Sequence, residues 1–163
     1  RNLWLGAAEN LDSWDLVCYL IAMLCVGFIE EILFRGMLFR AIEKDNHTTA
    51  VIVSSVTFGL GHILNMFNGV QNDWLVNICQ IVGAIAIGFL FVMVFDRGGS
   101  LWPCIIAHSA IDVVSAFANE EAVRAQPQLR VLLLGALLVV IGTYAIWLHH
   151  SLPRKPQKSE ALV

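Results

Sequence analysis

The sequence predicts an all-α protein, a polytopic transmembrane helical bundle with about five membrane helices. Hydrophobic residues make up 58% of the chain and charged residues only 14%, whereas soluble domains average roughly 45–50% and 25%. The mean hydropathy is +0.71. Five separate segments are apolar over nearly the roughly 20 residues needed to cross a hydrocarbon core. These observations predict an integral membrane protein.

The five predicted helices are separated by polar connectors rich in Gly, Asn or Asp, as loops usually are. They cover residues 13–43, 48–67, 74–95, 101–118 and 129–149. The first would be about 45 Å long if helical throughout. Because that exceeds one crossing, either one end projects into water or the helix breaks. The last has no ionisable group in its middle, which indicates a scaffold or lipid-facing helix.

The domain organisation follows from these segments. Residues 1–12 form an N-terminal flank, residues 13–151 the helical bundle, and residues 152–163 a basic, Pro-rich cytoplasmic tail. The chain begins at Arg1 without an initiator Met, so we expect it to be a piece of a longer protein with additional helices upstream. The net charge of −3, spread over loops, gives no indication of nucleic-acid binding.

Basic residues predict the orientation in the membrane. Alternating the helices across the bilayer places six Lys or Arg on one side and three on the other. The first group is Arg40, Lys44, Arg97, Arg154, Lys155 and Lys158, and the second is Arg1, Arg124 and Arg130. The positive-inside rule makes the richer side, with the C-terminus, cytoplasmic.

Ionisable side chains lie inside three of the apolar segments. The first segment contains Glu30, Glu31 and Arg35, the second His62, and the fourth His108 with Asp112. A charge at bilayer depth costs between about 2.5 and more than 10 kcal/mol, so such residues normally face a bundle interior and mark a functional site. A structural ion pair between Glu31 and Arg35 is the simplest non-catalytic interpretation.

Spacing predicts that these side chains meet. Counted from the cytoplasmic ends, Glu30 is about 13 residues deep, His62 about 14 and His108 about 7, or roughly 10 to 21 Å at helical rise. Residues four apart share one face of a helix, so His108 and Asp112 point the same way. We therefore expect one polar pocket that opens toward the cytoplasm.

These residues form three motifs in a familiar order. Glu30-Glu31-Ile32-Leu33-Phe34-Arg35, Phe58-Gly59-Leu60-Gly61-His62 and His108-Ser109-Ala110-Ile111-Asp112 resemble the EExxxR, FxxxH and HxxxN/D motifs of one family. It is the CAAX prenyl endopeptidase and bacteriocin-processing group, known as CPBP or Abi intramembrane proteases. The resemblance covers residues 16–118, the core of that family.

The resemblance implies a peptide-bond hydrolase that works within the bilayer on prenylated CAAX proteins or on peptide precursors. Glu30 would act as general base on a water, assisted by His62. His108 and Asp112 would stabilise the oxyanion, and Glu31 and Arg35 would hold the helices. An ionised Asp112 cannot donate a hydrogen bond. It would therefore be protonated, orient His108, or bind a cation.

Metal dependence stays open at the level of sequence. No cofactor is favoured, because water activated by glutamate and histidine needs none. Zinc remains an alternative, with Glu30, His62 and His108 as its ligands, although HExxH is absent and the site would have to be assembled from separate helices. Four cysteines, Cys18, Cys25, Cys79 and Cys104, lack metal-binding spacing and are expected to be inert core thiols.

Two other functions use the same residues. A proton or ion-coupled transporter also needs buried acids and histidines, but transporters usually show internal repeats and none is visible. A non-catalytic immunity or scaffold protein would have no need for all the motif residues. Packing explains further positions: Phe58 should contact the His62 ring, and Gly59, Gly61 and Gly88 should allow close helix approach.

Overall fold

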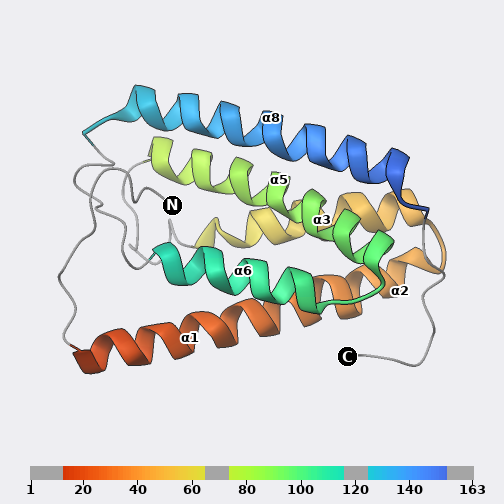
Figure 1. The fold of residues 1–163 in the computed structure, drawn as a ribbon, viewed down its shortest axis with the longest axis horizontal. Helices are drawn as coiled ribbons and strands as arrows, with labels where there is room; N and C mark the ends of the chain where they lie inside the picture. The colour runs from red at the N-terminus through yellow and green to blue at the C-terminus, as the bar shows by residue number, and fades with distance from the viewer. Residues whose placement is uncertain (1–12, 65–73, 116–124, 154–163) are drawn as a thin grey trace.

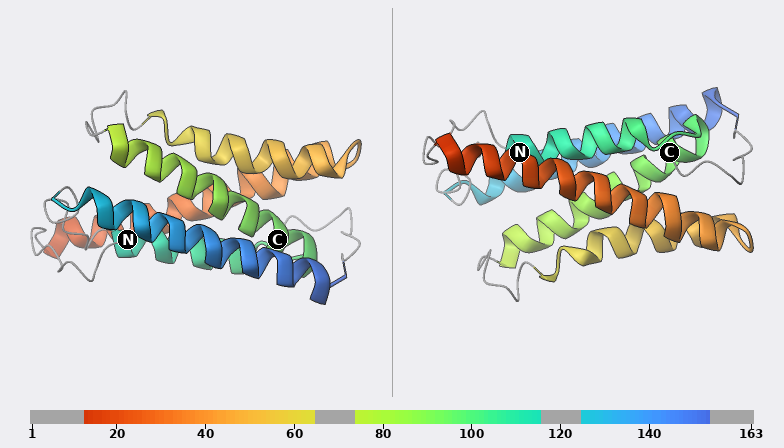
Figure 2. Two further views of the ribbon diagram at one scale, coloured as in Figure 1. Left: turned by 90° about the horizontal axis from the view of Figure 1, so that it is seen from above. Right: turned by 90° about the horizontal axis from the view of Figure 1, so that it is seen from below.

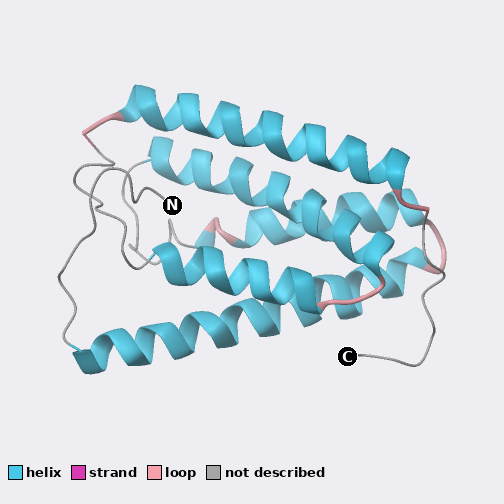
Figure 3. Ribbon diagram, viewed as in Figure 1, coloured by secondary structure: helices cyan, strands magenta, loops and turns pink. Residues whose placement is uncertain are grey.

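The computed structural model describes residues 13–64, 74–115 and 125–153, and these are helical apart from short connections, with no strand among them (Figure 3). The helices are α1 (Ser13–Glu31), η2 (Ile32–Phe39), α2 (Arg40–Glu43), α3 (His47–Gly61), α5 (Trp74–Gly98), α6 (Trp102–Ser115) and α8 (Pro127–Ser151). The predicted all-α class is confirmed. Residues 65–67 and 116–118, which the sequence placed in helices, lie outside the described ranges.

Successive long helices run in opposite directions along one bundle axis (Figure 1). Helix α5 is central, since it packs against α3 on one flank and α8 on another, while α1 pairs with α6 (Figure 2). Three helical stretches, Trp14–Glu43, Trp74–Gly98 and Pro127–Ser151, are long and apolar enough to cross a membrane. Together with the exposed apolar surface of α1 and α8, they define an integral membrane protein.

The first predicted helix spans its expected residues without a break, but its middle is not α-helical. Residues Ile32–Phe39 form a π-helix between α1 and α2. Within it, the Phe34 carbonyl accepts a hydrogen bond from the Ser54 hydroxyl of α3 at 2.8 Å, an external contact of the kind that accompanies irregular helix geometry. π-Helical turns often occur at functional sites. This one directly follows the adjacent acidic residues Glu30 and Glu31.

Small residues bring the helices close together. A Cβ at Gly59 would lie 2.7 Å from the Ile85 backbone nitrogen, and one at Gly88 would lie 2.9 Å from the Ser55 carbonyl. Helices α3 and α5 therefore approach at backbone distance, as predicted. The expectation for Gly61 was wrong, because no atom lies within 4 Å of a Cβ there. Gly61 lies two residues after Gly59, about 200° around the helix, so it faces away from α5 and is exposed.

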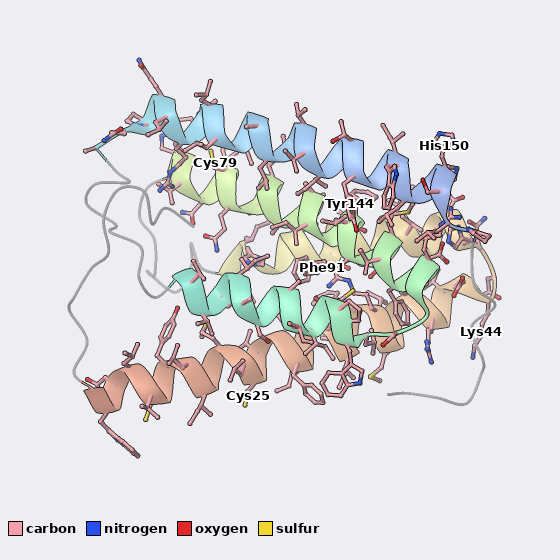
Figure 4. All side chains as sticks on the ribbon, viewed as in Figure 1. Cys25, Lys44, Cys79, Phe91, Tyr144 and His150 are labelled. Carbon is pink, nitrogen blue, oxygen red and sulfur yellow. The ribbon has the colours of Figure 1, made fainter. Side chains whose placement is uncertain are left out.

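The expectation that the four cysteines are core thiols was correct for Cys104 and wrong for Cys18 and Cys25. All four are free thiols, but only Cys104 is buried, while Cys18 and Cys25 are exposed on α1. They do not belong to the core, because α1 turns that face toward the surroundings, which for a membrane helix are lipid (Figure 4). The buried core lies between η2, α3, α5 and α6 and includes Phe39, Ala50, Phe91, Val92, Phe95, Leu101, Cys104 and Ile105.

Candidate active site

The end of α1 and the start of η2 carry a fully buried ion pair. Arg35 Nη1 donates to Glu31 Oε1 at 2.8 Å, and neither side chain has any exposed surface. Arg35 Nη2 donates to the Gly88 carbonyl of α5 at 3.1 Å, and its guanidinium lies 4.3 Å from the centre of the Phe58 ring. Arg35 therefore ties η2 to both α5 and α3, which agrees with the predicted pairing of Glu31 and Arg35.

His108 of α6 joins this ion pair through one ring nitrogen. Its Nδ1 lies 2.9 Å from Glu31 Oε1, so a single carboxylate oxygen receives hydrogen bonds from both His108 and Arg35. An ionised carboxylate only accepts hydrogen bonds, so Nδ1 must carry the proton. This contact fixes the orientation of the imidazole and leaves Nε2 as the nitrogen available for chemistry, as a carboxylate does for histidine in catalytic triads.

The other ring nitrogen of His108, Nε2, faces two further carboxylates. Nε2 lies 3.4 Å from Asp112 Oδ2 and 3.8 Å from Glu30 Oε2. The Glu30 side chain is 35% exposed and that of Asp112 is 23% exposed, against 6% for His108. Glu31 is thus the buried, structural member of the adjacent glutamates, and Glu30 is the accessible one. The gap between Glu30 and Nε2 is too long for a direct hydrogen bond and suits a bridging atom.

His62 reaches this group through Phe58. Its Nδ1 lies 3.3 Å from the Phe58 carbonyl, and its ring centre lies 5.8 Å from that of Phe58 in an edge-to-face arrangement. The same phenyl ring contacts His108, at 5.3 Å between ring centres. The structure therefore brings Glu30, Glu31, Arg35, His108 and Asp112 into one cluster and places His62 beside it, across an aromatic ring, where α3 ends.

Sequence reasoning missed two members of the cluster, both on α5. The Gly88 carbonyl accepts from Arg35, and the Phe91 ring lies 5.4 Å from the Arg35 guanidinium and 5.9 Å from the His108 ring. Phe91 is buried inside the bundle (Figure 4). Its position three residues after Gly88, on the same helix face, was the available signal, because Gly88 was already expected to mark a close approach.

The sequence left zinc as an alternative, with Glu30, His62 and His108 as its ligands. Among the described residues, one set of three His, Cys, Asp or Glu has ligand atoms all within 4.8 Å of one another, and it contains none of Glu30, His62 and His108. The cluster as it stands offers a carboxylate base and an oriented imidazole.

These features define a class of protein: a helical membrane protein whose interior holds a carboxylate, histidine and arginine cluster partly open to the outside. The chain belongs to the family described as type II CAAX prenyl endopeptidase Rce1-like, whose model matches residues 12–114. The matched range contains every residue of the cluster.

A curated relative points the same way. The chain is 30% identical over 97 residues to a Bacillus subtilis (strain 168) protein named "Putative membrane peptidase YdiL". The aligned region covers 59% of this chain and 34% of that protein, so the chain spans about a third of its relative's length. No solved structure matches the chain.

Proposed function

We propose that this chain provides the catalytic core of an intramembrane endopeptidase that hydrolyses a peptide bond near the cytoplasmic side of the bilayer. The observation that carries the proposal is the fixed orientation of His108. Glu31 holds Nδ1, and Nε2 then faces Glu30, a carboxylate with access to the surroundings. Family membership and the similarity to a protein named as a membrane peptidase support the same activity.

In the proposed reaction Glu30 acts as general base. It takes a proton from a water molecule while the water oxygen attacks the scissile carbonyl carbon, and His62 assists by orienting that water. The carbonyl oxygen becomes an oxyanion, which the protonated Nε2 of His108 stabilises. As the C–N bond breaks, the proton held by Glu30 passes to the leaving amine, so atoms and charge balance.

Asp112 is proposed to orient and charge His108, one of the three roles left open by the sequence. Its Oδ2 lies 3.4 Å from Nε2 and is four residues away on the same helix face. A carboxylate in this position favours the protonated imidazole, which is the form that donates to an oxyanion. Asp112 thereby contributes to oxyanion stabilisation through His108 and not as a donor itself.

The proposed substrates are membrane-associated polypeptides, with prenylated CAAX-type proteins and peptide precursors as the two candidates. Glu30 is flanked on α1 and η2 by exposed apolar side chains, including Phe28, Ile29 and Leu33. A hydrophobic segment or a lipid chain can lie along such a surface while the adjacent peptide bond reaches the carboxylate. The description of the matched family favours the prenylated class.

We also propose that hydrolysis proceeds by water activation without a metal at the cluster, and that the C-terminus is cytoplasmic. The first is supported by the arrangement of the cluster, in which Glu30 faces His108 and His62 packs on the far side of the Phe58 ring. The second rests on the positive-inside rule. Arg97 of α5 also contacts His149 of α8 and the carbonyl of Leu152, which follows α8, so the basic ends of these two helices lie together. Activity before and after chelation and a C-terminal topology reporter test them.

The decisive experiment is peptide cleavage by the purified full-length protein. Wild type, Glu30→Gln and His108→Gln are compared on a farnesylated CAAX peptide and on the same peptide without the lipid. His150→Gln, a change at an exposed histidine on α8, serves as the matched control. We expect cleavage by wild type and His150→Gln, and a loss of at least about 100-fold in the other two. Equal cleavage by all four proteins would refute the assignment.

The alternatives give different outcomes in the same material. An immunity or scaffold protein would cleave neither peptide, and a transporter would instead carry protons or ions across proteoliposomes in a manner that depends on Glu30 and His108.

A further inference from the structure

We propose that Glu43, His47 and Asp96 form a binding site for a divalent transition metal ion, with Zn²⁺ as the best match. The residues come from α2, from the first position of α3 and from the end of α5, and their ligand atoms all lie within 4.8 Å of one another. Glu43 comes twelve residues after Glu31, which corresponds to about 18 Å along the helix axis. The proposed site is therefore separate from the candidate active site and has no part in the proposed hydrolysis.

His47 supplies evidence that points to a ligand. Its side chain as a whole is 30% exposed, but the Nε2 atom is buried and makes no hydrogen bond with the described residues. That atom lies 3.4 Å from Asp96 Oδ1, and the Phe39 ring packs edge-to-face against the imidazole. A buried ring nitrogen without a hydrogen bond is costly, and a metal ion would use its lone pair.

Asp96 contributes a buried carboxylate to this group. The Asp96 side chain is only 2% exposed, and its two oxygens face different neighbours. Oδ2 lies 3.7 Å from Arg97 Nε, while Oδ1 faces His47. Arg97 is itself occupied by the Leu152 carbonyl and by His149 Nδ1.

The types of ligand atom in Glu43, His47 and Asp96 indicate which metal ion fits the site. One imidazole and two carboxylates suit zinc better than Mg²⁺ or Ca²⁺, which prefer oxygen ligands alone. Zinc bonds of about 2.0–2.2 Å place ligand atoms roughly 3.3–3.5 Å apart in a tetrahedral site. His47 and Asp96 already have this separation, so Glu43 needs only a side-chain rotation, and water can take the fourth position.

Such an ion would act as a structural brace. It would join α2, α3 and α5 at the end of the bundle where Lys44 and His150 also lie (Figure 4). Because binding to the folded state alone raises stability by mass action, zinc should raise the melting temperature without being needed for cleavage chemistry.

The test uses the purified full-length protein in detergent, stripped of metal and titrated with Zn²⁺ in a calorimeter, with melting temperature as a second readout. We expect one ion per chain and a higher melting temperature for wild type. His47→Gln should weaken binding at least tenfold and abolish the thermal shift, and Glu43→Gln should weaken binding. His150→Gln, the matched histidine control at the same end, should bind like wild type.

Three results would overturn the site: no zinc binding at micromolar concentrations, unchanged binding by His47→Gln, or loss of binding in His108→Gln instead. The metal-free melting temperature of each variant shows whether it folds. If His47→Gln fails this check, Glu43→Gln decides, since Glu43 is only partly buried. Binding and melting are measured without substrate, so this outcome is independent of whether the protein cleaves peptides.

Discussion

Glu31 and His108 are separated by 77 residues in the chain, yet Nδ1 of the histidine lies 2.9 Å from Oε1 of the glutamate. The same oxygen holds Arg35, so one buried atom joins α1, η2 and α6. This contact decides which ring nitrogen of His108 faces outward. It also gives the two adjacent glutamates different tasks, because Glu30 lies one residue earlier and turns toward the accessible side.

Glu31→Ala should destabilise the fold. Removing one partner of a buried pair leaves the other charge uncompensated, which costs about 3–5 kcal/mol, and here both Arg35 and His108 lose their acceptor. Unfolding in mixed detergent micelles would measure this loss. A variant as stable as wild type would show that the pair does not support the bundle.

Glu30→Gln should have the opposite profile. The Glu30 side chain is partly exposed and lies beyond direct hydrogen-bond distance from His108, so replacing it with an amide of equal size should change stability by less than about 0.5 kcal/mol. Cleavage should fall by at least about 100-fold, because the amide cannot accept the proton. Melting temperature and cleavage rate are measured in parallel on this variant. A loss of stability together with the loss of cleavage would contradict the separate roles of Glu30 in catalysis and Glu31 in structure.

The sequence was sufficient to predict the helices and the buried ion pair, because both depend on local spacing. Apolar length defined the helical segments, and Glu31 and Arg35 are four residues apart on one face. It did not predict the π-helix from Ile32 to Phe39, since that geometry depends on contacts with α3 and α5. The partner of Arg35 on α5 is the backbone carbonyl of Gly88. A contact to a backbone group cannot be predicted from the type of side chain at that position.

The placement of His62 shows a second limit. Counting residues gave His62 and Glu30 similar depths, but depth along a helix does not determine distance across a bundle. The Phe58 ring lies next to both histidines, a contact that the residue count did not predict for His108. Packing of this kind is set by the crossing of α3 and α5, which only the three-dimensional structure provides.

Asp112→Asn should retain measurable cleavage, within about tenfold of wild type, because the family resemblance accommodates either residue at this position. The amide keeps the size of Asp112 and a hydrogen-bonding group near Nε2, but it lacks the charge that favours protonated His108. Asp112→Ala should lose about 10–100-fold, the range typical of removing a group that orients a functional histidine. Steady-state cleavage rates compare the three proteins. Equal activity of the alanine variant would remove Asp112 from the mechanism.

Phe58→Leu should lower activity more than stability. The change keeps an apolar side chain but removes the aromatic face over Arg35 and the contacts with both histidines. A cation–π contact is worth about 0.5–2 kcal/mol, so the fold should survive while the histidines lose their shared support. Phe58→Tyr, which retains the ring, is the control, and equal rates for the leucine and tyrosine variants would exclude a positioning role for the aromatic ring.

Gly59→Ala and Gly61→Ala form a matched pair, because the same methyl group is added two residues apart on one helix. At Gly59 the new Cβ would lie 2.7 Å from the Ile85 backbone nitrogen, whereas at Gly61 it meets nothing within 4 Å. A backbone atom cannot move aside as a flexible side chain can, so α3 must shift away from α5, and Phe58 and His62 shift with it. Overpacking of this kind costs about 1–3 kcal/mol, and cleavage should fall together with the melting temperature. Gly61→Ala should match wild type in both measurements. If the two variants behave alike, the close approach of α3 and α5 does not position the histidines.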